Sequence, residues 1–431
     1  MVAPPHPVPI HHVIDTVWRM ESARVIAALV RMVRDVGLAE ELAQDALVAA
    51  LERWPSDGVP DNPGAWLMTT ARNRAIDRLR HLRLREEKHV QVAWELEQQQ
   101  DDARHREEHL LDDTVGDDVL RLMFIACHPV LPPDSRVALT LRLLGGLETG
   151  QIARAFLSTE ATVAQRIVRA KRTLAEARIP FELPRREQLP ERLAAVLGVI
   201  YLVFNEGYAA SSGGDWMRPG LCEEALRLGR ILAGLMPGEP EVHGLVALME
   251  LQASRLQART GADGHPVLLP DQDRSRWDRR LIESGLEALE RARRLERSPG
   301  PYALQAAIAA CHAAAASSAA TDWPRIVALY DVLARLAPSP VVELNRAVAV
   351  SMASGPHAAL PLVDALQDDR KLAGYHLLPS VRGDLLFRLG RMAEAAGEFE
   401  RAAAMTGNLR ERDLLLARAR HCTGVHSSGS A

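Results

Sequence analysis

The stretch that decides the fold is residues 147–174, which read LETGQIARAFLSTEATVAQRIVRAKRTL. Apolar residues recur every three or four positions in its second half and just beyond, as on one face of an α-helix: Val163, Ile167, Ala170, Leu174 and Ala177. Thr159 stands where its hydroxyl can cap the N-terminus of this helix. The other face carries Thr162, Gln165, Arg166, Arg169 and Arg172. The stretch therefore predicts a helix-turn-helix, whose second helix enters a DNA major groove.

A second basic helix is predicted upstream, over residues 65–87, directly after the breaker Asn62-Pro63-Gly64. Projected at about 100° per residue, one narrow stripe is apolar and consists of Met68, Ala71, Ala75, Leu79 and Leu82. The opposite side carries Thr70, Asn73, Asp77 and Arg80. Such a face can read base edges and phosphates, although a surface helix laced with salt bridges would show the same pattern.

The helix predicted over residues 39–54 is apolar on two sides. One side consists of Leu38, Leu42, Ala46 and Ala49. The other side carries Leu47, Val48 and Leu51 among Glu41 and Gln44. A helix of this kind is either fully buried or docks on a partner.

Charge is segregated along the chain, although the total is only -4. Residues 66–85 carry a net charge of +5, residues 86–118 a net charge of -9, and residues 160–178 a net charge of +3. The rest of the chain from residue 185 carries equal numbers of acidic and basic side chains. This order fits two nucleic-acid-binding segments joined by an acidic linker, and a C-terminal half without an electrostatic attraction to nucleic acid.

Composition points to a globular, all-helical chain of about two to four domains. The 431 residues are 47% hydrophobic but only 4% aromatic, and alternating strand patterns are rare. The four cysteines lie far apart, which argues against a zinc site or a disulfide framework. We expect neither a metal nor a cofactor, and phosphate-loop, nucleophile-elbow and HExxH motifs are absent from the sequence. The longest apolar run is too short to cross a bilayer, so a cytoplasmic protein is expected.

Together these residues resemble the extracytoplasmic-function (ECF) sigma factors, which are specificity subunits of bacterial RNA polymerase. Residues 38–46 (LAEELAQDA) are similar to sigma region 2.2, and residues 62–77 (NPGAWLMTTARNRAID) to regions 2.3 and 2.4. Gln151-Ile152-Ala153 and residues 162–171 (TVAQRIVRAK) are similar to region 4.2. The chain departs from the family at Leu157-Ser158-Thr159, where most members have a turn with a left-handed glycine.

The resemblance implies three sets of binding residues and two partners, the RNA polymerase core and promoter DNA. The residues implied to bind the polymerase are Glu41, Gln44, Asp45, Leu47, Val48 and Leu51. Those implied to contact the minus-ten element are Thr70, Asn73, Arg74, Asp77 and Arg80. Those implied to contact the minus-thirty-five element are Thr162, Gln165, Arg166, Val168, Arg169 and Arg172. No catalytic residue is implied, so an enzyme is not expected.

The C-terminal half shows a weak repeat of helix pairs. Gly355 and Gly390 each separate two Ala-rich helices, and residues 388–395 (RLGRMAEA) resemble a tetratricopeptide (TPR) turn. Residues 201–208 (YLVFNEGY) and 211–216 (SSGGDW) resemble the signature of the ECF subgroup with a C-terminal TPR-like extension. The implied regulatory motif is Tyr201, Phe204, Asn205, Glu206, Gly207 and Tyr208, which could contact the sigma domains. Alternatively, Gly207 is merely the C-cap of a helix over residues 190–206.

The expected organisation is therefore a sigma region 2 domain (10–88), an acidic linker (89–116), a region 4 helix-turn-helix domain (117–182) and a TPR-like helical domain (185–424). The expected function is that of an ECF sigma factor regulated by its own C-terminal extension. Two alternatives remain at this point: a TPR scaffold whose basic helices bind RNA or acidic partners, and a helix-turn-helix repressor that acts without polymerase.

Overall fold

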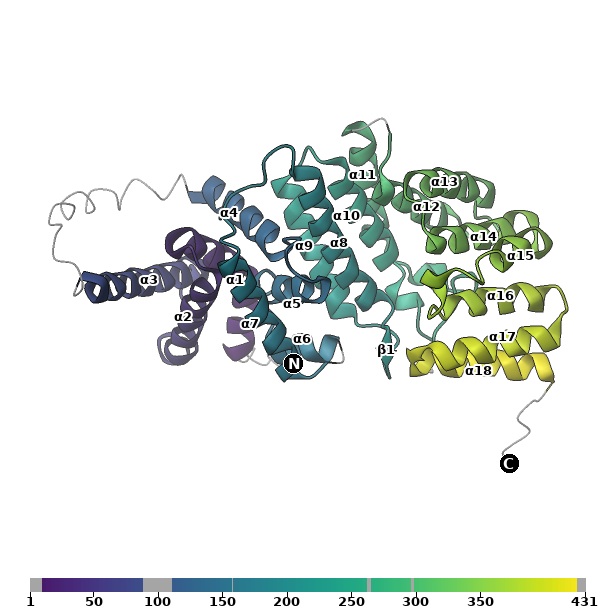
Figure 1. Ribbon diagram of the computed structural model, residues 1–431, viewed down its shortest axis with the longest axis horizontal. Coiled ribbons are helices and arrows are strands. Elements are labelled where there is room, and N and C mark those ends of the chain that lie inside the picture. The colour runs from purple at the N-terminus through teal and green to yellow at the C-terminus, as the bar shows by residue number, and fades with distance from the viewer. Residues whose placement is uncertain (1–9, 88–110, 157, 262–264, 296–297, 425–431) are drawn as a thin grey trace, which may run out of the picture. The chain divides into compact units, whose positions relative to one another are not determined.

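The computed structural model describes residues 10–87, 111–156, 158–261, 265–295 and 298–424, which fold into α-helices joined by loops (Figure 1). The all-helical class is as predicted, apart from one pair of two-residue strands. The chain divides into two compact units, one ending at Val199 and the other beginning at Ile200. This boundary falls inside α8 (Leu189–Tyr208).

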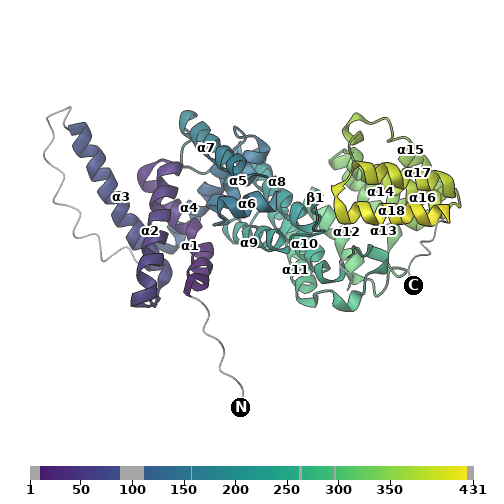
Figure 2. The ribbon, with the colours of Figure 1, turned by 90° about the horizontal axis from the view of Figure 1, so that it is seen from below.

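Three long helices form a bundle at the start of the first unit: α1 (Ile10–Val33), α2 (Val36–Asp57) and α3 (Pro63–Glu87). Each of the three packs against the other two, and Figure 2 shows them next to one another. Small buried residues let the helices approach closely, and in α2 these are Ala39, Ala43, Ala46, Ala49 and Ala50. The side chain of Asp35 caps α2 by accepting a 2.7 Å hydrogen bond from the Leu38 amide, so the helix starts earlier than the predicted residue 39.

Helix α3 agrees with the helix predicted over residues 65–87. Asn62 caps it, since its Oδ1 accepts a 3.0 Å hydrogen bond from the Ala65 amide. In the predicted apolar stripe, Ala71 and Ala75 are buried while Met68 and Leu79 are half-buried. The side chain of Leu82 lies outside the described part of the chain, as do residues 88–110 of the expected acidic linker.

The predicted helix-turn-helix is present as α6 (Thr149–Ala155) and α7 (Glu160–Glu176), which pack with α4 (Leu111–Ala126) and α5 (Pro133–Leu143). Thr159 caps α7 as predicted, with its Oγ1 accepting a 3.1 Å hydrogen bond from the Thr162 amide. The predicted inner stripe is buried except at Ala177, where the prediction was wrong because the helix ends at Glu176. Leu157 in the unusual turn lies outside the described residues, and α4 begins within the segment expected to be linker.

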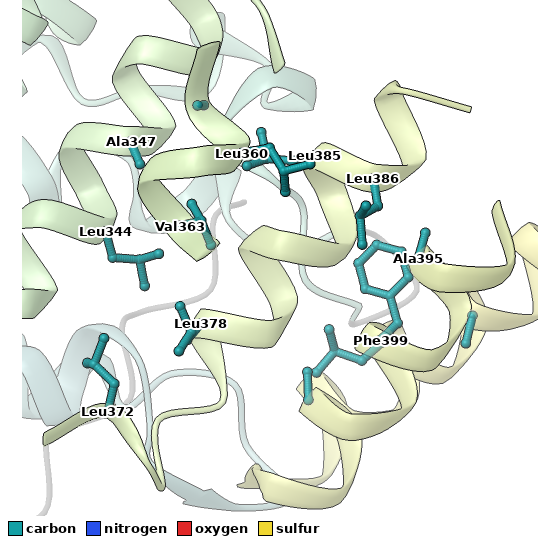
Figure 3. Close-up of a cluster of buried hydrophobic side chains, with 14 of the residues drawn as sticks. Leu344, Ala347, Leu360, Val363, Leu372, Leu378, Leu385, Leu386, Ala395 and Phe399 are labelled. Carbon is teal, nitrogen blue, oxygen red and sulfur yellow. The ribbon is translucent and has the colours of Figure 1, made fainter. Parts of the chain in front are cut away.

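The second unit continues from α8 as a succession of helices and short 3-10 turns. Its further α-helices are α9 (Pro219–Leu235), α10 (Pro240–Ala253), α11 (Arg279–Leu295), α12 (Pro301–Ala314), α13 (Trp323–Leu336), α14 (Pro340–Ser354), α15 (Pro356–Asp364), α16 (Leu377–Arg388), α17 (Met392–Met405) and α18 (Leu409–Thr423). Helix α10 is buried almost throughout because α9, α11 and α12 all pack on it. A separate core joins α14 to α18 around Leu344, Leu386 and Phe399 (Figure 3).

Strands β1 (Ser212–Gly213) and β2 (Gly407–Asn408) tie the beginning of this unit to its end. Their parallel pairing is reinforced by Asn408, which is 1% exposed. Its Nδ2 donates hydrogen bonds to the carbonyl oxygens of Ala210 (3.0 Å) and Asp215 (2.8 Å). Its Oδ1 accepts from the amides of Arg410 and Glu411 and so caps α18. We call residues 210–215 and 407–411 the strand clasp.

Candidate nucleic-acid and polymerase interfaces

Helix α2 presents an apolar strip to solvent, on the side where the sequence predicted a docking surface. Val48 is 49% exposed and Leu51 is 38% exposed, whereas Leu47 is half-buried. Among the polar residues predicted to surround them, Glu41 and Asp45 are exposed and Gln44 is half-buried. The opposite side of the helix is fully packed, so α2 is not a buried helix but one with a free apolar strip.

Helix α3 places the predicted minus-ten residues at the surface to different degrees. Asn73, Asp77 and Arg80 are exposed, while Thr70 and Arg74 are half-buried. A guanidinium nitrogen of Arg74 lies 3.6 Å from a carboxylate oxygen of Asp45, which joins the predicted DNA face of α3 to the predicted polymerase face of α2. The two predicted surfaces are therefore neighbours.

Helix α7 exposes five of the six residues predicted to read the minus-thirty-five element: Thr162, Gln165, Val168, Arg169 and Arg172. Val168 is 63% exposed, which suits a contact with a thymine methyl group rather than a core position. Arg166 is half-buried and forms a 3.2 Å ion pair with Asp134 of α5. Arg172 pairs with Glu176 one turn later at 2.6 Å. At the centre of the face, Nη2 of Arg169 donates a 3.4 Å hydrogen bond to Oε1 of Gln165, and both side chains are exposed.

The six residues of the predicted regulatory motif all lie on α8 and have partners inside the second unit. The ring of Tyr201 packs edge-on against Tyr302, with 5.5 Å between centroids, and burial raises the pKa of Tyr201. Phe204 is buried and stacks on the ring of Tyr208 at 5.7 Å. Asn205 hydrogen-bonds the Tyr201 side chain. Glu206 forms an ion pair with Arg218. The motif thus builds the interior of the second unit.

Gly207 is not a helix C-cap, so the alternative reading of this residue was wrong. Helix α8 continues to Tyr208. A Cβ atom at Gly207 would lie 2.7 Å from the backbone nitrogen of Cys222 and 2.8 Å from Cβ of Leu221. The residue is glycine because α9 crosses α8 at this point with almost no space between the backbones.

A cluster of arginines over aromatic rings contacts the motif at Tyr208, and the sequence analysis did not predict it. Its members are Arg255, Arg259, Arg274, Tyr208, Trp216 and Trp277. The guanidinium carbon of Arg259 lies 3.7 Å from the ring centroid of Tyr208, and Nη2 donates a 3.1 Å hydrogen bond to the Tyr208 carbonyl. Burial lowers the pKa of Arg259, and repulsion from Arg255 lowers it further. No local pattern marks Arg259 in the sequence, because it acts on a motif 51 residues away.

Burial and the neighbouring Arg255 and Arg274 lower the pKa of His312 to about 4, so this histidine is neutral at pH 7. Within the described ranges, no three His, Cys, Asp or Glu side chains gather as metal ligands would. In the same ranges, no helix is both long and apolar enough to cross a bilayer.

Comparison with protein families divides the chain in the way its helices suggest. Residues 17–85 match Sigma-70 region 2, which covers most of α1, α2 and α3. Residues 121–174 match Sigma-70 region 4, from α4 to α7. Residues 192–293 match a family of unknown function, DUF6596, from α8 to α11. A probable ECF RNA polymerase sigma factor, SigI of Mycobacterium tuberculosis, is 30% identical over 170 residues.

The chain is an ECF sigma factor. It carries regions 2 and 4, followed by a helical DUF6596 extension. Like other sigma factors it is a non-enzymatic transcription initiation factor, which binds core RNA polymerase and promoter DNA and uses the helix-turn-helix of region 4 for DNA.

The relatives of this sigma factor differ in how much of the chain they share. The match to SigI covers 39% of this chain and 57% of SigI. The ECF RNA polymerase sigma factor SigK of Mycobacterium ulcerans is 27% identical over 159 residues, which is 35% of this chain and 78% of SigK. An uncharacterized protein of Rhizobium meliloti (strain 1021) is 47% identical over 406 residues, covering 92% of this chain and 94% of the relative. That relative therefore shares the C-terminal extension as well.

Proposed function

We propose that this sigma factor directs core polymerase, in the cytoplasm, to promoters with minus-ten and minus-thirty-five elements. The observation that carries the proposal is the face of α7, where Gln165, Val168 and Arg169 are exposed while the opposite stripe is buried. In this assignment α7 reads the minus-thirty-five element, and Thr70, Asn73, Arg74, Asp77 and Arg80 of α3 read the minus-ten element. The strip of Val48 and Leu51 on α2 docks on the polymerase.

We expect Arg169→Ala to lower transcription from the cognate promoter about tenfold or more, because a good base contact contributes roughly 1–3 kcal/mol. The measurement is in vitro transcription with core polymerase at moderate salt. Arg186→Ala is the matched control, since Arg186 is an exposed arginine outside α7 and its loss changes net charge equally. Equal activity of the two variants would remove Arg169 from the promoter interface.

We also propose that the C-terminal extension is TPR-like and regulates the sigma factor. Helix pairs begin at Trp323, Pro356 and Met392, a spacing close to the roughly 34 residues of a TPR unit. Gly355 and Gly390 precede the last two pairs with positive φ angles of 88° and 75°, a backbone conformation that glycine adopts readily. In this proposal the domains are region 2 (10–88), the acidic linker (89–116), region 4 (117–182) and the TPR-like extension (185–424). The motif on α8 acts through the shape of the extension, since its side chains are engaged within it.

Asn408→Ala tests this regulation in the full chain. Loss of the amide leaves the buried carbonyl oxygen of Ala210 and the carbonyl oxygen of Asp215 without this donor, at a cost of about 1–3 kcal/mol. We expect transcription to change several-fold in either direction while helix content at 25 °C stays the same. Gln367→Ala, which removes an exposed amide bonded only to nearby Asp364, is the control. Amide hydrogen exchange shows whether Asn408→Ala opens the strand clasp. If the clasp is open and the variant still transcribes like the wild type, the extension does not regulate through this part of its fold.

A further inference from the structure

Glu40 is a buried carboxylate that belongs to region 2 but is paired with region 4. It lies on α2 and is 3% exposed. Arg142 of α5 places its Nε 2.6 Å from Glu40 Oε1, and Lys171 of α7 forms an ion pair with Oε2. Within α2, the side-chain amide of Gln44 donates a 2.5 Å hydrogen bond to Glu40 Oε1. The two cations therefore come from the other promoter-binding region. We call Glu40, Arg142 and Lys171 the Glu40 latch.

The latch fixes how α5 and α7 lie against α2. A carboxylate that is taken out of water without a partner is strongly destabilising, so the buried position of Glu40 depends on Arg142 and Lys171. Arg142 is itself held, because its Nη1 donates a 3.1 Å hydrogen bond to the Leu147 carbonyl. Lys171 also packs along the start of α2, where its Cδ would lie 3.8 Å from a Cβ at Gly37.

Two further contacts continue the interface between regions 2 and 4. Asp118 of α4 is fully buried and pairs with Arg31 of α1 at 3.5 Å as well as with Arg121 at 2.6 Å. Gly146, with a positive φ of 63°, lets the turn after α5 approach α1 so closely that a Cβ would lie 2.8 Å from Ser22 Oγ. Region 4 is therefore seated on α1 and α2 by charge pairs and by close backbone packing.

We propose that the Glu40 latch holds regions 2 and 4 together in the free protein and opens when the two regions engage the polymerase and the promoter. This rests on the proposed function, in which α3 and α7 read different promoter elements. Opening is reversible because the three ionic groups regain hydration when they separate, which offsets much of the lost attraction. Lys171 lies on the side of α7 that packs against α2, so opening also exposes its ammonium group to solvent.

The test measures amide hydrogen exchange in the full-length protein without polymerase or DNA. Glu40→Gln preserves the shape of the side chain but removes its charge, and Glu52→Gln makes the same change at an exposed position of α2. We expect amide exchange in residues 36–44 and 163–174 to be about tenfold faster or more in Glu40→Gln, and unchanged in Glu52→Gln. The reason is that Glu40→Gln loses hydrogen bonds to a charged carboxylate. Equal exchange in the two variants would overturn the latch.

Lys171→Gln tests the same contact from region 4 and guards against misfolding of the buried Glu40 variant. Its side chain is 23% exposed, so the new glutamine keeps contact with water, and Arg142 still pairs with Glu40. Amide exchange in the double variant Glu40→Gln, Lys171→Gln should be no faster than in the faster-exchanging single variant, because the two substitutions remove the same interaction. Strictly additive effects would contradict the latch.

Transcription separates the latch from the function on which it rests. At limiting core polymerase, we expect Glu40→Gln to give several-fold more transcript than Glu52→Gln. If the wild type transcribes and the two variants give equal transcript, the latch is not regulatory. If the wild type itself fails to support promoter-dependent transcription with a cognate core, the proposed function fails, whatever the exchange data show.

Discussion

Gly207→Ala is expected to lower the free energy of unfolding of the second unit by about 1–3 kcal/mol, because the added methyl group overpacks the crossing of α8 and α9. The new Cβ would meet the backbone nitrogen of Cys222 at 2.7 Å, and a backbone atom cannot move aside as the end of a flexible side chain can. The measurement is chemical denaturation of the full-length protein, followed by the circular dichroism of its helices.

Gly198→Ala provides a matched control within the same helix. Gly198 also lies in α8, but a Cβ there meets nothing within 4 Å. Alanine has a higher helix propensity than glycine, so this variant should be more stable by about 0.5–1 kcal/mol. The two identical substitutions are therefore expected to have opposite signs. A stabilising Gly207→Ala would show that α8 and α9 do not approach as closely as described.

The double substitution Val48→Asp, Leu51→Asp is expected to lower the affinity for core polymerase roughly 100-fold or more. Both side chains are exposed in the free protein, so the fold tolerates carboxylates at these positions. Buried against a partner, each aspartate would lose apolar contact and carry an unpaired charge into the interface. Co-purification with core enzyme and a binding titration measure the effect.

A matched control places the same change on an exposed apolar strip elsewhere. Val332 and Leu336 of α13 are exposed to a similar degree. Val332→Asp, Leu336→Asp introduces the same charge and should bind the polymerase like the wild type. Unchanged binding of the α2 variant, with its helix content intact, would rule out this strip as the docking surface.

Helix periodicity made much of the fold predictable from the sequence. The buried stripes of α3 and α7 recur at helical spacing, and Thr159 is a local capping signal, so each could be recognised within a window of about 18 residues. The exposed faces of α2, α3 and α7 follow from the same periodicity, since a side chain opposite a buried stripe faces water. The misplaced end at Ala177 shows the usual uncertainty at helix boundaries.

Features that depend on contacts between distant segments could not be predicted in this way. Glu40 reads as one more charged residue in a polar stretch, and nothing near it indicates that Arg142 and Lys171 will bury it. Arg259 is one of many arginines, and its position over Tyr208 depends on the tertiary fold. Gly207 was noticed, but its role was misjudged because only the neighbouring α9 explains it.

The strand clasp has a consequence for how the second unit comes apart. In an open array of helical repeats the last repeat has one neighbour only, so such arrays fray from their ends and unfold in stages. Here the segment that begins α18 is bonded to the segment that follows α8, so the terminal helices have a second set of partners. Because the first and last segments of the unit are in contact, its end is no longer the place where local unfolding begins most easily. The unit should therefore unfold in one cooperative step, and a substitution that destabilises any one helix should lower the stability of the whole unit.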